Sequence, residues 1–394
     1  MLTTEEDPGR GAAPSARETA VPGAGETASP RQAPSTEEAA PSPSTQEAAP
    51  SLSAGQAPSP GQPLSPPELP SPPELPSPGA DAPAEESLTS TGKPPGRRLA
   101  LTALLAAVLI ALHAHLPDTA LNLGSLFQTL LPWTGLAVLV LLALAAVRRS
   151  RLAAVAVLAP ALVWATLLGP TLIDKRSTGH GLTVLSHNVD EANPDPAGTA
   201  RALAGAKADL LALVELSHES APVYERELAA AYPHHTVLGG VGLWSRYRLS
   251  AVAVVEIMPW TRAMRATAAT PKGPVAVYAA HLASVRVSAA GFTTGRRNEA
   301  ARALAAAVRA ETTPRVVVLG DFNGTYQDRA LAPVTSQLRS AQREAGSGFG
   351  FTYPAGFPVV RIDDVLVKGL TPLASWTLPA TGSDHRPVAA TLRL

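Results

Sequence analysis

The chain has 394 residues, and its 32 Lys and Arg balance 32 Asp and Glu, so the formal net charge is zero. A balanced charge gives no global field that would favour a nucleic-acid partner. The absence of cysteine excludes disulfides, thiolate zinc sites and a cysteine nucleophile. Composition changes sharply along the chain, which we therefore divide into three regions, residues 1–92, 93–176 and 177–394.

Residues 1–92 are rich in Pro, Ser, Ala, Glu and Gly. Such a segment buries too little apolar surface to offset chain entropy, so we expect a disordered cytoplasmic tail. Its tandem repeat, Ser65–Pro70 followed by Ser71–Pro76, favours polyproline II and is either a solvated spacer or a docking site for a cytoplasmic partner. Because Met1–Arg10 carries acids instead of a basic run and an apolar core, we expect no signal peptide there.

Residues 93–176 contain three apolar runs, at about 99–116, 127–147 and 152–173. Each approaches the roughly 20 residues that a helix needs to cross about 30 Å of hydrocarbon, so we predict three transmembrane helices. Basic residues precede the first run and separate the second from the third: Lys93, Arg97, Arg98, Arg148, Arg149 and Arg151. The positive-inside bias places these ends in the cytoplasm, so an odd number of spans leaves the third region outside it. Buried core helices of a soluble domain are the alternative, which the lack of a polar face disfavours.

Residues 177–394 have the pattern of an α/β domain. Short β-branched runs predict strands at about 182–187, 210–214, 251–257, 275–280, 316–319, 364–367 and 388–392. Ala-rich stretches predict helices at about 197–206, 221–230 and 296–310. Polar residues gather where the predicted strands end.

The side chains at those strand ends suit a hard cation and a phosphate. They are Asn188, Asp190, Glu215, His281, Asp321, Asn323, Asp363, Asp384 and His385. Carboxylate and amide oxygens without thiolates favour Mg²⁺ or Mn²⁺. A histidine whose tautomer is held by Asp363 or Asp384 can transfer a proton or contact a phosphate. Each residue alone is more often a turn former, a helix cap or an ordinary buried histidine, so the prediction depends on their coincidence.

Several short blocks resemble the endonuclease/exonuclease/phosphatase superfamily, which contains DNase I-like nucleases, inositol polyphosphate phosphatases and neutral sphingomyelinases. The blocks are Leu185–Asp190, Asp209–Glu215, Gly242–Tyr247, His281–Leu282, Gly320–Asn323, Arg361–Asp363 and Ser383–Val388. The resemblance covers the third region and implies a four-layer α/β/β/α sandwich, with two sheets packed face to face between helices. It also implies a metal-dependent hydrolase of phosphoric esters or pyrophosphates that uses Mg²⁺, or alternatively Mn²⁺.

The same resemblance implies a role for each residue. Metal ligation falls to Asn188, Glu215 and Asp384, and catalysis to His281, Asp321, Asn323, Asp363 and His385. Asp321 would position or deprotonate the attacking water, and Asn323 and His281 would donate to phosphoryl oxygens. Asp363 would orient His385, whose imidazole contacts the phosphate.

Two acidic positions stay open. Asp190 matches a position that is acidic in some members of the superfamily. Asp364 departs from the superfamily, which often has an aromatic residue or a histidine there. Its carboxylate would either be exposed on the surface or repel the substrate.

Three predicted spans ahead of such a domain resemble the VanJ-type membrane proteins associated with teicoplanin resistance. This resemblance implies removal of phosphate from undecaprenyl pyrophosphate at the outer face of the cell membrane. A domain held close to the membrane meets lipid head groups at high effective concentration. The third region is only mildly basic and lacks the aromatic-interleaved basic stripe that tracks nucleic acid. We therefore expect a phosphorylated lipid substrate and a multi-pass membrane protein; the alternatives are an extracytoplasmic nuclease, a sphingomyelinase-like phosphodiesterase and a non-catalytic lipid-binding domain.

Overall fold

The computed structural model describes residues 96–118, 121–288 and 291–394. All of them belong to one compact unit, Glu85–Leu394. The predicted tail, residues 1–92, and Lys93 lie outside the described residues.

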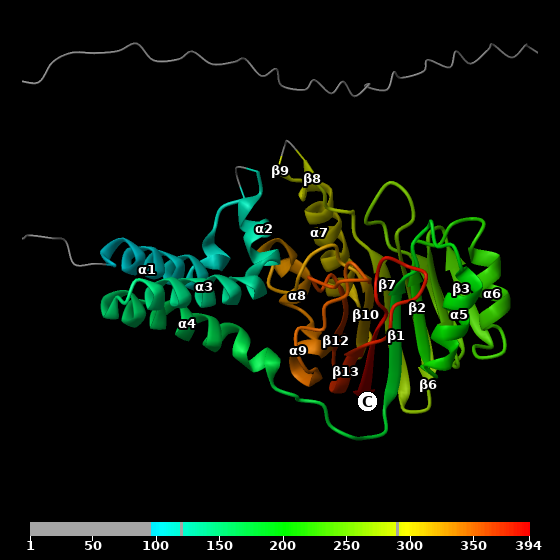
Figure 1. The fold of residues 1–394 in the computed structure, drawn as a ribbon. Helices are drawn as coiled ribbons and strands as arrows, with labels where there is room; N and C mark the ends of the chain where they lie inside the picture. The colour runs from blue at the N-terminus through cyan, green and yellow to red at the C-terminus, as the bar shows by residue number, and fades with distance from the viewer. Residues whose placement is uncertain (1–95, 119–120, 289–290) are drawn as a thin grey trace, which may run out of the picture. The chain divides into compact units, whose positions relative to one another are not determined.

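Two six-stranded sheets form the body of the third region (Figure 1). The strands of the first sheet are β1 (Leu182–Asn188), β2 (Leu210–Val214), β3 (His234–Leu238), β4 (Val241–Ser245), β13 (Thr371–Thr377) and β14 (Val388–Arg393). Those of the second are β5 (Leu249–Val254), β6 (Ala263–Thr270), β7 (Gly273–His281), β10 (Val316–Asp321), β11 (Arg339–Ser340) and β12 (Asp363–Lys368). The first sheet runs in the order β13-β14-β1-β2-β4-β3, and the second in the order β11-β12-β10-β7-β6-β5.

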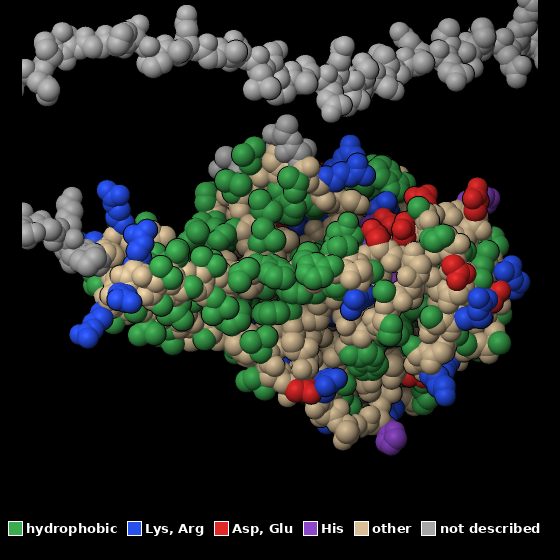
Figure 2. Space-filling model, in the orientation of Figure 1, with side chains coloured by type: hydrophobic (Ala, Val, Ile, Leu, Met, Phe, Trp, Pro, Cys, Tyr) green, Lys and Arg blue, Asp and Glu red, His purple; other side chains and the backbone are tan. Residues whose placement is uncertain are grey.

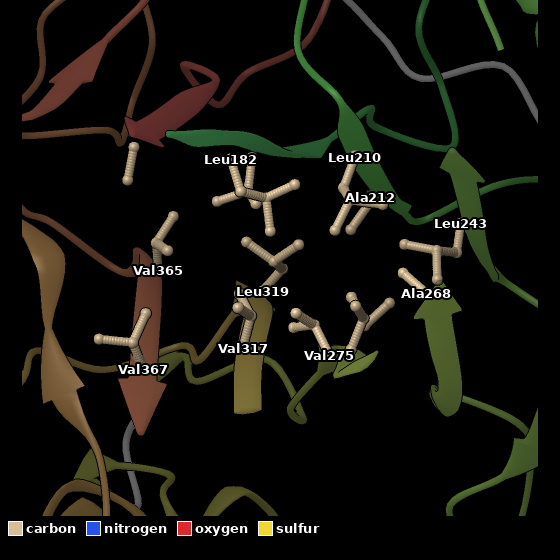
Figure 3. Close-up of a cluster of buried hydrophobic side chains, with 14 of the residues drawn as sticks. Leu182, Leu210, Ala212, Leu243, Ala268, Val275, Val317, Leu319, Val365 and Val367 are labelled. Atoms are coloured by element: carbon tan, nitrogen blue, oxygen red, sulfur yellow. The ribbon is translucent and has the colours of Figure 1, made fainter. Parts of the chain in front are cut away.

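The two sheets pack face to face through an apolar core, because side chains alternate between the faces of a strand. In β1, Leu182 and Val184 point into the space between the sheets, and Leu185 points to the opposite face. Figure 3 shows this core, where residues such as Leu182 of the first sheet face Leu319 of the second.

Helices cover both outer faces. They are α5 (Pro196–Gly205) and α6 (Ala221–Leu228) on the first sheet and α7 (Gly295–Ala310) on the second. Shorter elements complete the domain: β8 (Val287–Ser288), β9 (Gly291–Phe292), α8 (Ala332–Thr335) and α9 (Ala341–Ala345). The predicted arrangement of two sheets between helices is therefore confirmed.

Strand register brings the predicted site residues to one edge of each sheet. In the first sheet β1 and β2 are parallel, with Asn188 opposite Val214, so both strands end side by side. In the second sheet β7 and β10 are parallel, with His281 opposite Asp321, and antiparallel β12 begins with Asp363 opposite Asp321. The ends of five strands thus deliver polar side chains to the same edge of the sandwich.

The second region forms a small helical bundle. Its helices are α1 (Arg97–Ala111), α2 (Leu123–Thr129), α3 (Thr134–Val147) and α4 (Arg151–Leu172). The three longer helices contact one another through Ala103, Val138 and Val157. A Cβ added at Gly96 would lie 2.0 Å from Ser150 Oγ, so α1 and α4 start next to each other.

The structure does not support three complete membrane spans. Among the described residues, α4 is the one helix that is long and apolar enough by itself, and α2 with Leu131–Val147 would form a second span only with a bend of 64°. The run predicted at 99–116 forms an α-helix of 15 residues, about 22 Å long against about 30 Å of hydrocarbon. The run predicted at 127–147 is interrupted because Pro132 lacks the N–H that a continuous helix would use.

The outer faces of the bundle are apolar. Leu105, Leu139 and Leu162 are 61%, 61% and 66% exposed on α1, α3 and α4. Figure 2 shows hydrophobic side chains spread over the bundle, with Lys and Arg gathered at the end away from the sheets. A contiguous apolar surface of this kind marks contact with a membrane or with another protein.

Helix α2, which contains the start of the second predicted span, instead docks on the sandwich through polar contacts. Arg297 Nη1 of α7 lies 2.7 Å from Asp328 Oδ2, and both side chains are fully buried. Ser125 Oγ of α2 donates to Asp328 Oδ1 at 3.1 Å and accepts from Arg297 Nη2 at 3.4 Å. Arg297 Nη1 also donates to the Asn323 carbonyl at 3.2 Å, so this buried network joins α2 to the loop after β10.

Asp328→Ala should lower the free energy of unfolding by about 3–5 kcal/mol, because it leaves the Arg297 guanidinium buried without a counter-charge. Denaturant unfolding of the purified protein, followed by tryptophan fluorescence, measures the change. The double variant Arg297→Met with Asp328→Leu removes both charges and should cost much less. A single variant no less stable than the double variant would contradict the account.

Candidate active site

The two sheets meet at a hydrogen bond between the ends of β1 and β10. Asn188 Nδ2 donates to Asp321 Oδ2 at 3.2 Å, and both side chains are buried. Asn323 also holds Asp321, since its backbone N–H donates to Oδ1 at 2.8 Å and its Nδ2 donates to Oδ2 at 3.0 Å. The second amide hydrogen of Asn323 reaches the Leu282 carbonyl at 3.0 Å. In this structure Asn323 therefore positions Asp321, and the donation to a phosphoryl oxygen that the resemblance implies would need its amide to turn.

Glu215 and His281 lie next to Asp321. Glu215 directly follows β2 and has a φ of 60°, in the left-handed region that residues other than glycine rarely adopt. Its Oε1 lies 3.4 Å from His281 Nε2, which lies 3.6 Å from Asp321 Oδ2. Burial and the nearby charge of Arg262 hold the pKa of His281 well below its usual value, so this imidazole is neutral.

His385 forms a pair with Asp363 on the other side of Asp321. Its Nδ1 lies 2.8 Å from Asp363 Oδ2, and its Nε2 lies 3.9 Å from Asp321 Oδ2. Burial alone would lower the pKa of His385, but the negative charges of Asp363, Asp321 and Asp384 outweigh it and raise the pKa to about 10. Burial and the charge of Asp363 raise the pKa of Asp321 to about 7. A protonated imidazole thus faces a carboxyl group that can accept a proton near neutral pH.

Asp384 and Asp190 lie at the rim of this group. The Asp384 side chain is 51% exposed, and its Oδ1 lies 3.8 Å from His385 Nε2. Burial is the main reason that the pKa of Asp384 is raised, and the charge of Asp190 also raises it. Asp190 itself closes a turn after β1, because its Oδ1 accepts from the Ala192 N–H at 2.9 Å.

Asp364 is neither exposed nor directed at the site. Successive residues of β12 point to opposite faces, so Asp363 faces His385 and Asp364 faces away. Asp364 Oδ1 accepts from Arg361 Nη2 at 2.9 Å, and its Oδ2 accepts from Ser340 Oγ at 2.7 Å. Both alternatives that the sequence left for Asp364 are therefore wrong, because its charge is buried and paired.

Two residues of the site, Arg262 and Tyr353, lie outside the seven sequence blocks that resemble the superfamily, so the sequence analysis did not identify them. Arg262 Nη1 lies 3.1 Å from both ring nitrogens of His281. The ring of Tyr353 lies 4.9 Å from the ring of His385, centroid to centroid. Arg262 precedes β6, which was not predicted, and Tyr353 lies in a long loop, so only the folded chain brings them to the site.

A basic cavity of about 630 Å³ adjoins the site. Three arginines, Arg262, Arg286 and Arg296, share its wall with Trp260 and Met258. Within the described ranges, none of the three guanidinium groups forms an ion pair with Asp or Glu. Because Arg262 belongs both to this wall and to the surroundings of His281, an anion in the cavity would lie next to the site.

The donor set fits a divalent cation. Asn188, Glu215 and Asp384 offer amide and carboxylate oxygens, the donors that Mg²⁺ and Mn²⁺ prefer. Burial raises the pKa of Glu215, so its charge lacks full compensation by the protein alone. Asp321, Asp363 and His385 form a tighter buried cluster, with ligand atoms within 4.8 Å of one another. Because His385 Nδ1 already lies 2.8 Å from Asp363 Oδ2, only Nε2 of this histidine is left for a cation or a phosphate.

The chain was compared with known proteins. Residues 185–385, just over half of the chain, match the Endonuclease/Exonuclease/phosphatase family. No curated protein sequence matches the chain. Among solved structures, an endonuclease/exonuclease/phosphatase from Beutenbergia cavernae is 18% identical, with 55% of this chain and 72% of that chain covered and a TM-score of 0.45.

Two further structures are similar. TDP2 from D. rerio, complexed with single strand DNA product, is 17% identical, with 55% of this chain and 100% of that chain covered and a TM-score of 0.48. An endonuclease/exonuclease/phosphatase from Bacteroides vulgatus is 16% identical, with the same shares covered and a TM-score of 0.46.

Asp363→Asn should lower the pKa of His385, because it removes the carboxylate charge that opposes burial. In metal-free wild-type protein we expect His385 to stay protonated at pH 8, and in the variant to lose its proton at or below neutral pH. Histidine side-chain NMR over a pH series measures this. Asp364→Asn is the matched control, since that carboxylate points to Arg361; equal titration of His385 in all three proteins would contradict the pairing.

Proposed function

This chain belongs to the Endonuclease/Exonuclease/phosphatase family, and we propose that it is a Mg²⁺-dependent hydrolase of a phosphorylated lipid at the membrane. The observation that carries the proposal is the meeting of Glu215, Asp321 and His385, from separate strand ends, around one point. Polar groups so arranged are suited to binding one phosphate and one cation.

Each residue then has a chemical role. Asn188 and Glu215 would hold a divalent cation, which would neutralise charge on a phosphoryl oxygen. Asp321 accepts the proton of the attacking water, as its raised pKa allows. His385, held by Asp363, donates from Nε2 to a phosphoryl oxygen as negative charge develops there.

The helical bundle supports a membrane location. Helix α4 is 22 residues long, about 33 Å, and its exposed leucines would be solvated by lipid. Arg148, Arg149 and Arg151 lie at its start, and positive-inside bias puts that end in the cytoplasm. The sandwich, which follows the other end of α4, then lies outside the cytoplasm, whether or not α1 and α3 also cross the membrane.

The basic cavity supports a substrate with a second anionic group. A phosphate bound at Asp321 and His385 would have Arg262, Arg286 and Arg296 nearby, and none of the three forms an ion pair with Asp or Glu among the described residues. If water attacks the lipid-bearing phosphorus of a pyrophosphate at Asp321 and His385, the terminal phosphate would lie at these guanidinium groups, which bind phosphate oxygens through paired N–H donors. It would then leave as inorganic phosphate. A polyprenyl pyrophosphate such as undecaprenyl pyrophosphate combines this head group with a membrane tail.

Glu215→Gln should raise the Mg²⁺ concentration needed for half-maximal activity by at least tenfold, because an anionic ligand is lost. Phosphate release from farnesyl diphosphate in detergent, titrated with Mg²⁺ after EDTA treatment, measures the shift. Glu219→Gln, an exposed acid four residues further on, is the matched control. An unchanged Mg²⁺ requirement in Glu215→Gln would remove this residue from the ligand set.

Arg286→Ala should raise KM for farnesyl diphosphate at least about fivefold and leave KM for farnesyl monophosphate nearly unchanged, since a charge-assisted contact with the second phosphate contributes about 1–3 kcal/mol. Steady-state kinetics on both substrates measure the difference. Arg309→Ala, on the far turn of α7, is the control. Equal effects on both substrates would contradict the second-phosphate assignment, and rapid cleavage of plasmid DNA without release from either lipid would favour the nuclease alternative.

A further inference from the structure

An apolar groove of about 540 Å³ lies between the helical bundle and a loop of the sandwich. Helices α3 and α4 contribute Leu136, Leu139 and Trp164, and the loop contributes Phe349 and Phe351. Trp133, next to the start of α3, closes one side, and every lining residue is apolar or glycine. The volume falls within the range of about 300–1,000 Å³ typical of small-ligand sites.

Ring stacking and indole hydrogen bonds hold the aromatic wall of the groove in place. Trp133 stacks on Phe351 with ring centroids 6.0 Å apart, and Phe351 stacks on Phe349 at 5.2 Å. Trp133 Nε1 donates to the Val359 carbonyl at 2.8 Å, and Trp164 Nε1 donates to the Pro132 carbonyl at 3.2 Å. Because both indole N–H groups are already satisfied, the tryptophans present only their apolar faces to the groove.

One side of the groove belongs to the outer surface of the bundle. Leu136 and Leu139 are 57% and 61% exposed, and they continue the apolar surface that extends over α3. A hydrocarbon chain can therefore pass from the surroundings of the bundle into the groove without crossing polar groups.

On the other side, three consecutive residues of one loop join the groove wall to the active site. Phe351 lines the groove, the Thr352 hydroxyl accepts from the Asp363 N–H at 3.4 Å, and the Tyr353 ring contacts His385. The Cα atoms of Phe351 and Tyr353 are at most about 7 Å apart. A ligand long enough to touch both residues would lie in the groove and at His385 at once.

We propose that this groove binds the hydrocarbon chain of the phosphorylated lipid whose head group is hydrolysed at Asp321 and His385. The inference rests on the proposed function and extends it, because it assigns a site to the tail. Two observations choose the occupant. The apolar surface of the bundle borders one end of the groove, and Phe351 in its wall is two residues before Tyr353, whose ring contacts His385.

Leu139→Trp, which fills the groove, tests the proposal on two diphosphates that differ only in their tails. We expect KM for farnesyl diphosphate to rise roughly tenfold, the effect of losing about two buried methylene groups. KM for dimethylallyl diphosphate, whose tail is too short to fill the groove, should stay within a factor of two. Leu105→Trp on α1 is the control, because Leu105 has the same exposure and lies outside the groove. Equal KM for farnesyl diphosphate in Leu139→Trp and wild type would overturn the proposal.

A binding measurement separates the groove from the chemistry. A farnesyl diphosphate analogue with a photoreactive group on its tail should label residues 132–139 or 349–351 in phospholipid vesicles without Mg²⁺. Labelling should persist in Glu215→Gln and fall in Leu139→Trp. Labelling of the groove, with no phosphate release from farnesyl diphosphate when Mg²⁺ is then supplied, would support the groove and refute the proposed hydrolysis. Release on addition of Mg²⁺ without labelling of these residues would refute the groove alone.

Discussion

Four carboxyl groups, Glu215, Asp321, Asp363 and Asp384, lie close together around His281 and His385, and their mutual repulsion is the constraint on which the site depends. Like charges in a medium of low dielectric destabilise one another. His385 compensates part of that repulsion, because the carboxylates raise its pKa to about 10 and it carries a positive charge. Protonation of Asp321, whose pKa is raised to about 7, removes a further negative charge. The remaining charge is what a divalent cation would compensate. Metal binding and the stability of this site are therefore linked.

The four carboxyl groups lie close together because of how the strands pair, and no single sequence motif contains them all. Parallel pairing of β1 with β2 and of β7 with β10 places strand ends together, and β12 begins where β10 ends. This much could be predicted from the sequence, because buried β-branched runs followed by polar residues mark such ends. The seven predicted strands and three predicted helices of the third region all occur, with ends shifted by a few residues. Asp364 could not be interpreted, since the alternation that turns it toward Arg361 depends on where β12 starts.

The sequence analysis missed β6, the position of Arg262 and the packing of α2, because all three depend on contacts between residues far apart in the sequence. Strand β6, Ala-Met-Arg-Ala-Thr-Ala-Ala-Thr, has few β-branched residues and becomes a strand because it pairs with β7 along its whole length. Arg262 reaches His281 only through that pairing. In the second region, hydropathy alone assigned the last residues of α2 to a membrane span. In the structure α2 instead packs on the sandwich, because Ser125 hydrogen-bonds to the buried Arg297–Asp328 pair. Local hydrophobicity carries no information about such a long-range polar contact.

The bundle and the sandwich share a surface, because Trp133 contacts Phe351, two residues before Tyr353 at the site. One loop thus connects the helices of the proposed membrane location to the residues of the proposed chemistry. The most direct test of the central claim is anomalous diffraction from crystals grown with Mn²⁺. We expect one strong Mn²⁺ peak at the site, within about 2.0–2.6 Å of a Glu215 carboxylate oxygen. Mn²⁺ bound only at other surfaces, with Asn188 and Glu215 free of any ion, would contradict the claim that these strand ends form a metal-dependent phosphate site.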